Sequence, residues 1–303
     1  MKVLSNPYNG SYDLSIIGLG YESRAEYQFN KNKEILGHIV SVGYDKYTNF
    51  FNYPGLKDKY KSSGIDIIEG NDDDVIFNTI NWLNDEICTD KPINVFIDIT
   101  VMSRKRLSAL IYHLLENLPK KSTLTISYEL SSFVQAPSGL SPIRKVGEVI
   151  PQLSGDIGDL NYPTSVVLGL GYEEGKALGL VNFIDAEYNY IFVPIGKDIR
   201  FDRTVSDNNR ILFEGIPENR IFKYRLEHPY NTYLDLRDLV LSISEFSSPL
   251  LAPLGPKIFA AISVVLAKEL DQGMPVWRVS SEQEEEPVDR AASGNTLQLS
   301  IVL

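Results

Sequence analysis

The sequence predicts an α/β fold made of two tandem Rossmann-like units, each with a mostly parallel β-sheet. Short apolar runs alternate with segments of helical period along most of the 303-residue chain, a pattern typical of parallel strands joined by helical crossovers. The pentapeptide Gly-Leu-Gly-Tyr-Glu also occurs twice, at 18–22 and 169–173, each time directly after an apolar run. The pattern predicts the sheets, and the repeat predicts that one unit occurs twice.

Other segments match at nearly the spacing of the two pentapeptides. Five elements in one order at one spacing seldom arise by chance, so we expect an internal duplication. The matching pairs are 38–46 on 189–197, 98–105 on 251–257, 108–118 on 260–270, and 124–130 on 275–281.

The first unit is expected to span residues 1–140. Its strands are predicted where apolar runs of four to seven residues occur, and its helices where apolar residues recur with a period near 3.6. Three aspartates at 72–74 suit the positive end of a helix dipole, and Ser103 can cap the helix that follows it. The expected strands are 13–18, 38–43, 64–68, 93–99 and 123–129, and the expected helices are 22–33, 72–87 and 103–117.

The second unit is expected to span residues 164–281, on the same criteria. Residues 141–163 are rich in proline, glycine and serine and are predicted to be a linker. Residues 282–303 are expected to form an acidic tail, whose final apolar run could add an edge strand or pack on a partner. The expected strands are 165–169, 189–194, 220–225, 248–252 and 275–280, and the expected helices are 173–184, 230–244 and 256–270.

Composition and charge exclude several classes of function. The net charge of −11 argues against broad nucleic-acid binding and against binding to an anionic membrane surface. The apolar run 258–267 is about half the length of a membrane span. One cysteine and three separate histidines predict neither an internal disulfide nor a metal site, and they do not assemble into a catalytic triad. We expect a cytoplasmic protein that does not bind membranes.

The repeated turn is the first candidate site. In open parallel sheets, ligands bind beyond the carboxyl ends of the strands, and both copies of the turn are predicted to lie there. Glycines allow a close approach of the backbone to a ligand, and the helix that follows favours an anion. The alternative is a tight turn that binds nothing. The candidate ligand-binding residues of this turn are Gly18, Gly20, Tyr21 and Arg24, with Gly169, Gly171, Tyr172 and Glu173 in the second copy.

A second turn, at 98–106, combines a carboxylate at the end of an apolar strand with three consecutive basic residues. Asp98 ends an apolar strand, and Arg104, Lys105 and Arg106 begin the next helix, where the helix dipole disfavours positive charge. Either a ligand phosphate or a nearby carboxylate, Asp98 or Glu22, is expected to compensate for this charge. The corresponding turn of the second unit offers Gly255 and Lys257 but lacks the spacing of an NTPase phosphate loop.

These turns resemble those of the CARF family, and two fused units of this kind resemble the SAVED family. Of the family's Thr-Gly-Gly-Thr-Lys-like run, Gly255 and Lys257 match in the second unit and Lys105 in the first. The resemblance implies a prokaryotic sensor of cyclic oligonucleotides made during antiviral defence, with the ligand lying across a two-fold interface between paired units. Such a site would be lined by Tyr21, Glu22, Arg24, Arg104 and Lys105 from one unit and by Tyr172, Glu173, Lys176 and Lys257 from the other.

Three functions follow from this reading. The first is a sensor that binds a nucleotide or another phosphate-bearing small molecule, with a protein partner in a defence complex. The second is a nucleotide-processing hydrolase or nuclease of the first unit, in which Glu22 or Asp98 is the general base and Arg24 or Arg104 stabilises transition-state charge. The third is a non-catalytic subunit of a larger assembly. The sequence assigns no cofactor.

Overall fold

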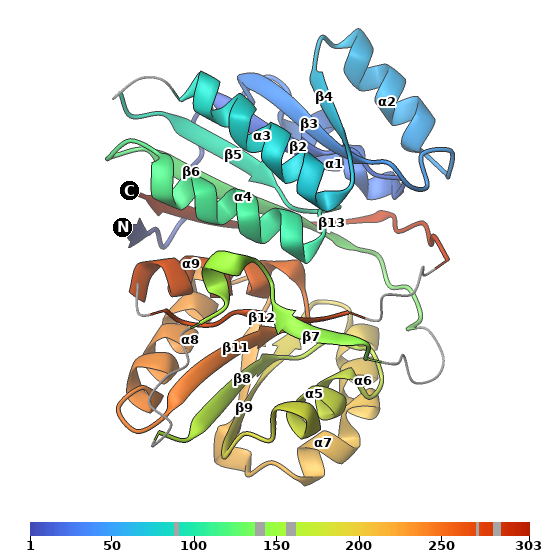
Figure 1. The fold of residues 1–303 in the computed structure, drawn as a ribbon. Helices are drawn as coiled ribbons and strands as arrows, with labels where there is room; N and C mark the ends of the chain where they lie inside the picture. Colours follow the sequence, from blue (N-terminus) through green and yellow to red (C-terminus); the bar gives the residue numbers. More distant parts are fainter. Residues whose placement is uncertain (88–90, 137–142, 156–161, 271–272, 281–285) are drawn as a thin grey trace. The chain divides into compact units, whose positions relative to one another are not determined.

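The computed structural model describes the chain except for residues 88–90, 137–142, 156–161, 271–272 and 281–285. It divides the chain into two compact units (Figure 1). The first comprises Met1–Ser132 together with Glu285–Leu303, and the second comprises Phe133–Glu284. Both units are α/β and contain a mostly parallel sheet, so the predicted α/β class with mostly parallel sheets is confirmed. The units are not in tandem as predicted, because the second lies between two segments of the first.

The first unit is built on a seven-stranded sheet with the order β1-β13-β6-β5-β2-β3-β4. The five strands from β6 to β4 are parallel to one another, whereas β13 is antiparallel to both β6 and β1. The strands are β1 (Lys2–Val3), β2 (Leu14–Gly18), β3 (His38–Tyr44), β4 (Asp66–Gly70), β5 (Asn94–Asp98), β6 (Thr123–Ser131) and β13 (Ala292–Val302).

Helices cover both faces of this sheet. On one face, Ile17 and Phe96 pack with Phe29 of α1 and with Tyr53 and Tyr60 of α2 in one buried cluster. The helices α3 and α4 lie side by side across the other face (Figure 1). The helical segments are η1 (Ser23–Glu26), α1 (Tyr27–Asn32), α2 (Tyr53–Ser62), α3 (Asp72–Glu86) and α4 (Arg104–Asn117).

The second unit contains a four-stranded parallel sheet with the order β10-β9-β8-β11. A separate antiparallel ribbon of β7 and β12 packs on one face of it through Val146, Trp277 and Val279. The strands are β7 (Lys145–Glu148), β8 (Thr164–Gly169), β9 (Tyr188–Ile195), β10 (Ile221–Arg225), β11 (Ser248–Pro253) and β12 (Trp277–Ser280).

The helices α5, α6 and α7 pack on the same face as the ribbon, where Leu180, Val205 and Leu212 join its apolar cluster. The aromatic rings of Phe192 and Tyr224 instead pack against Phe259 of α9. The helical segments are η2 (Pro151–Leu153), α5 (Lys176–Ile184), α6 (Ile199–Asn208), α7 (Arg210–Glu214), η3 (Glu218–Arg220), α8 (Pro229–Ile243) and α9 (Lys257–Leu270). No helix of the described part of the chain is long and apolar enough to cross a membrane.

The two parallel sheets share one strand order. In the first unit, β2 lies between β3 and β5, and β4 lies on the outer side of β3. In the second unit, β8 lies between β9 and β11, and β10 lies on the outer side of β9. In both units, the next extended segment is parallel to the last of these strands. In the first unit β6 pairs with β5, and in the second Val276 forms an isolated bridge with Leu251 of β11. This shared order is compatible with the expected duplication, but it does not show common descent, and the duplication remains a prediction.

The boundaries of the two units in the structure differ from the expected boundaries. Part of the segment 141–163, expected to be a linker, forms β7 and pairs with β12 inside the second unit. The expected acidic tail contains β13, which lies between β6 and β1 rather than at the edge of the sheet. The pairing partners of these segments are more than a hundred residues away in the sequence, so local composition did not indicate them.

Candidate functional site

The repeated turn follows β2 in the first unit, and packing explains its glycines. Gly18 is the last residue of β2, and a Cβ atom there would overlap the Cγ2 atom of Val101. A Cβ atom at Gly20 would lie 3.0 Å from the Cβ atom of the same valine. Between the glycines, Leu19 is fully buried and its N–H donates to the carbonyl of Val42. Both glycines therefore let the turn after β5 pack closely on this one.

The second copy of the turn follows β8 and is packed in a similar way. A Cβ atom at Gly169 would overlap the ring of Phe259, and one at Gly171 would lie 2.9 Å from the carbonyl oxygen of Leu254. The N–H groups of Leu254 and Gly255 both donate to the carbonyl of Gly169, at 2.9 and 2.8 Å. Gly255, expected to bind a ligand, is thus needed where two backbone segments meet.

The tyrosine of each pentapeptide contacts an aromatic side chain from the connection after β3 in the first unit and after β9 in the second. The ring of Tyr21 lies 6.1 Å from the rings of both Tyr47 and Phe51. The ring of Tyr172 lies 5.9 Å from that of Phe201 on α6. The same neighbour relation therefore occurs in both units.

The glutamate of each pentapeptide forms an ion pair with a nearby cation. Glu22 pairs with Arg24 at 2.6 Å and with Arg290 at 3.4 Å, and Glu173 pairs with Lys176 at 2.8 Å. Burial acts to lower the pKa of Arg24, but Tyr128 and Glu22 outweigh it and raise this pKa above its ordinary value. The two glycines and the glutamate of the pentapeptide thus have a structural role in both copies.

Asp98, expected to act as a general base, lies at the end of β5 and is almost fully buried. Its Oδ1 atom accepts hydrogen bonds from both the N–H and the hydroxyl of Thr100. The Oγ1 atom of Thr100 in turn accepts from the N–H of Glu129 at 2.9 Å. Asp98 therefore helps to join the ends of β5 and β6.

The sequence did not single out Glu129, although it lies near the end of β6. This fully buried carboxylate accepts from the N–H of Gly294 and the hydroxyl of Thr296, both at 2.7 Å. The one signal in the sequence is a carboxylate within an otherwise apolar and hydroxyl-rich run, "LTISYEL". Glu129 holds β13 in the sheet.

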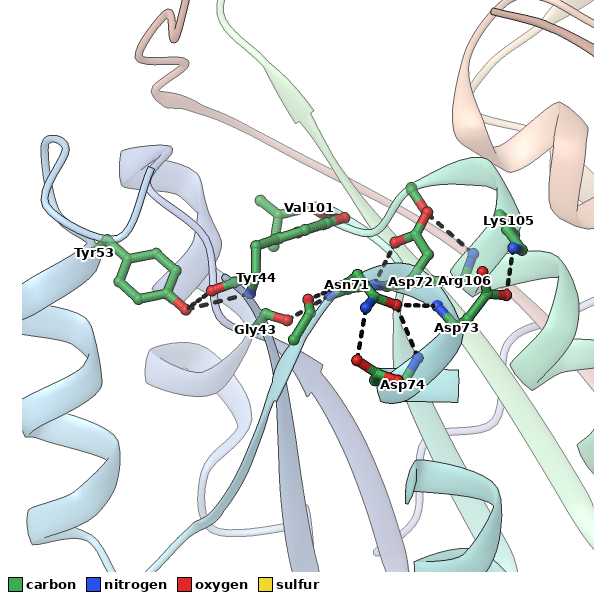
Figure 2. Close-up of polar contacts among 12 residues, drawn as sticks. Gly43, Tyr44, Tyr53, Asn71, Asp72, Asp73, Asp74, Val101, Lys105 and Arg106 are labelled. Atoms are coloured by element: carbon green, nitrogen blue, oxygen red, sulfur yellow. Dashed lines mark hydrogen bonds and ion pairs between the residues drawn. The ribbon is translucent and has the colours of Figure 1, made fainter. Parts of the chain in front are cut away.

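The charges that compensate the basic start of α4 come from α3. Asp72 pairs with Arg106 at 2.6 Å, and Asp73 pairs with Lys105. Figure 2 shows both carboxylates directed toward these cations from the start of α3. We expected Glu22, Asp98 or a ligand phosphate in this role. For Lys105 and Arg106 the structure supplies the aspartates at the start of the neighbouring helix instead, because β4 and β5 bring both helix starts to one edge.

Arg106 is the most enclosed of these cations, with no exposed surface. Its guanidinium donates to the carbonyls of Gly43 and Gly70 at 2.6 and 2.7 Å, and it lies 3.7 Å from the centre of the Tyr44 ring (Figure 2). Burial raises the pKa of the Tyr44 hydroxyl to about 12. Arg106 thus ties the ends of β3 and β4 to α3, and this role is structural.

Arg104 and Lys257 occupy equivalent places, since each is the first residue of its helix, α4 or α9. Lys105, expected to match Lys257, is the second residue of α4. The match between the two units is therefore displaced by one position at this turn. The expectation that residues of both units line one site remains a prediction.

One group of aromatic side chains at the carboxyl edge of the first unit's sheet is partly exposed. We call Tyr21, Tyr47, Phe50 and Phe51 the aromatic patch. Phe50 and Phe51 are 44% and 55% exposed, and the ring of Tyr47 lies 5.5 Å from that of Phe50. Tyr47 and Phe51 have φ angles of 59° and 43°, which non-glycine residues rarely adopt. Such strain is concentrated at functional sites.

Among the described residues, no group of three or more histidine, cysteine or carboxylate side chains could hold a metal ion. The aspartates at 72–74 instead begin α3, where the side chain of Asn71 accepts from the N–H groups of Asp73 and Asp74 at 2.9 and 3.0 Å. Figure 2 shows this cap beside the pair of Asp72 and Arg106.

No protein-family model matches the chain, and no curated protein does. Among solved structures, the chain is similar to the cytoplasmic domain of a prokaryotic cation chloride cotransporter, at 10% identity and a TM-score of 0.28 over 90% of this chain and 97% of that one. It is also similar to phosphoethanolamine N-methyltransferase 1 of Haemonchus contortus, at 7% identity and a TM-score of 0.26 over 98% and 89% of the two chains. These values are too low to carry an argument about function.

Proposed function

We propose that the first unit binds a nucleotide at the carboxyl edge of its sheet and that the protein is a sensor rather than an enzyme. The observation that carries the proposal is the aromatic patch. It combines Tyr21 of the turn after β2 with Tyr47, Phe50 and Phe51 of the connection after β3, and two of its rings are largely exposed. Carboxyl edges of parallel sheets are where ligands of such folds bind.

An exposed aromatic patch suits a nucleobase. Bases stack on aromatic side chains, and each such contact contributes about 1–3 kcal/mol without requiring one particular base. Lys46 directly precedes Tyr47 and places a positive charge in the same connection. The patch is therefore chemically suited to a ligand that is aromatic at one end and anionic at the other.

The surroundings of the expected catalytic groups favour binding over catalysis. A general base must reach the proton that it removes. Glu22 is held by two arginines, and Asp98 is 1% exposed and bound to Thr100. Both carboxylates stabilise the fold, which makes the hydrolase or nuclease function the weaker alternative.

The proposal extends to the biological role through the resemblance to the CARF and SAVED families. On that resemblance, the ligand is a cyclic oligonucleotide, the protein acts in prokaryotic antiviral defence, and its signal passes to a protein partner. These parts of the proposal rest on the turns at Gly18, Lys105 and Gly255 alone.

Calorimetric titration with AMP, ATP and a cyclic oligoadenylate tests the proposal. We expect the wild-type protein to bind at least one of these probes. Phe51→Ala should weaken that binding about fivefold or more, because one stacking contact of about 1 kcal/mol or more is lost. Phe77→Ala is the matched control, since Phe77 is also an exposed phenylalanine (65%) but lies on α3.

Failure of all three probes to bind would overturn the proposal and would favour the non-catalytic assembly subunit. Equal weakening by Phe51→Ala and Phe77→Ala would remove the patch from the binding site. Release of cleaved nucleotide during the titration would favour the enzyme.

A further inference from the structure

The segment Glu286–Ala291, which we call the strap, precedes β13 and runs along the turn after β2. It contains no helix or strand, and Glu286, Val288, Asp289 and Ala291 are exposed. We propose that the strap is an autoinhibitory segment, which must leave the turn before the nucleotide binds. This inference rests on the proposed function and adds the regulation of that site.

Three polar contacts hold the strap on the turn. The N–H of Ser23 donates to the Oδ1 atom of Asp289 at 2.7 Å, and the N–H of Arg24 donates to the carbonyl of Arg290 at 3.2 Å. The guanidinium of Arg290 lies 3.4 Å from Glu22. These contacts involve the three residues that follow Tyr21, so the strap adjoins the aromatic patch.

The strap carries negatively charged groups, like the anionic ligand with which it would compete. The Asp289 carboxylate is held on the N–H of Ser23, two residues after Tyr21, so it places a negative charge beside the aromatic patch. Glu286 adds a second negative charge to the same short segment. Glu286 and Asp289 outnumber the one cation of the strap, Arg290, and the side chain of Arg290 is directed to Glu22. The net negative charge of the bound strap therefore disfavours an anionic ligand beside it.

The strap can move while the sheet stays intact. The regular pairing of β13 with β6 runs from Thr296 to Val302 and is interrupted between Ala292 and Thr296. Gly294, within this interruption, has a φ angle of +79°, in the region that glycine adopts readily. Val288, the strap's large apolar side chain, is 41% exposed and gives little anchoring. Ala291 and Ala292 are held by Ser132 and Ser131 of β6, so the part of the strap that can leave the turn without breaking contacts of the sheet is residues 286–290.

The strap contact predicts that Asp289→Asn binds more tightly than wild type. We expect the dissociation constant for the tightest of AMP, ATP and the cyclic oligoadenylate to fall roughly three- to tenfold, because the hydrogen bond that holds the strap loses its charge and weakens, and the repulsion of the ligand by Asp289 is removed. Asp58→Asn, which removes an exposed charge on α2, is the matched control and should leave the constant unchanged. Thermal unfolding verifies that both variants fold.

Hydrogen exchange provides a second readout. Saturating wild type with the same probe should speed exchange of the Arg24 amide, whose acceptor is the carbonyl of Arg290, while leaving residues 296–302 protected. An unchanged or weaker affinity of Asp289→Asn, or exchange of the Arg24 amide that slows on binding, would overturn the inference although wild type binds. If neither wild type nor Asp289→Asn binds any probe, the proposed function itself fails, and the inference fails with it.

Discussion

At the scale of single residues, neighbouring cations in the first turn of α4 have different environments. Arg106 is fully buried and donates to a carboxylate and two backbone carbonyls, whereas Lys105 pairs with Asp73, whose side chain is 80% exposed. Removing a buried cation leaves its partners without a donor and destabilises the fold, whereas an exposed ion pair is screened by water and contributes little to stability.

This contrast gives a prediction for two variants of adjacent residues. Arg106→Ala should lower the free energy of unfolding by about 3–5 kcal/mol, because Asp72 and the carbonyls of Gly43 and Gly70 lose their donor. Lys105→Ala should lower it by about 1 kcal/mol or less. Urea unfolding at neutral pH measures both. Similar losses of unfolding free energy in the two variants would mean that the buried contacts of Arg106 do not stabilise the fold more than the exposed pair of Lys105.

At the scale of elements, β13 completes the sheet of the first unit from far along the sequence. It pairs with β6 on one side and with β1 on the other. Glu129 binds it through Gly294 and Thr296. Without β13, a fully buried carboxylate and the edge of an apolar strand would face water.

A chain that ends at Ala291 should therefore fail to form the first unit. We expect it to be insoluble or to lack cooperative unfolding, because β6 loses its antiparallel neighbour and Glu129 loses two donors. Soluble yield and circular dichroism during heating are the measurements. As a control, a chain that starts at Ser5 lacks the two paired residues of β1 and the hydrogen bond from the N–H of Leu4 to the carbonyl of Ser300, but it keeps β13 and should unfold cooperatively. Cooperative unfolding of both chains would show that β13 is dispensable.

At the scale of the whole molecule, the second unit is an insertion between β6 and β13. The chain leaves the first unit at Ser132 and returns to it at Glu285, and within the first unit the N–H of Ser132 donates to the carbonyl of Ala291 at 2.9 Å. The two segments that flank the insertion are thus adjacent at Ser132 and Ala291, as in domains that tolerate insertion.

This arrangement predicts that the first unit folds without the insertion. Replacing Phe133–Arg290 with a two-residue Asn-Gly turn should join β6 and β13 as a hairpin and leave the seven-stranded order intact. Circular dichroism should show mixed α/β structure with one cooperative thermal transition. A compact species that binds a hydrophobic dye and lacks such a transition would contradict the prediction.

Most of the helices and strands were predictable because their signals are local. Each predicted strand appears within a few residues of its expected place, and Asn71 and Ser103 cap helices at the predicted starts. The helix α2 was missed because "YPGLKDKYKS" combines proline, glycine and lysines with only three buried side chains, Tyr53, Leu56 and Tyr60. Proline is tolerated in the first turn of a helix, so this one does not break α2.

By itself, the sequence determined the α/β class, the strand–turn–helix order and the placing of both Gly-Leu-Gly-Tyr-Glu turns at carboxyl edges. These features depend on residue spacing within short windows. Only the tertiary structure decided that Asp72 compensates Arg106, that Glu129 holds β13, and that the strap lies on the turn at Ser23. The partners in these contacts are between 34 and 266 positions apart. No local pattern encodes such pairs, because they form only when the strand order brings distant segments to one edge of the sheet.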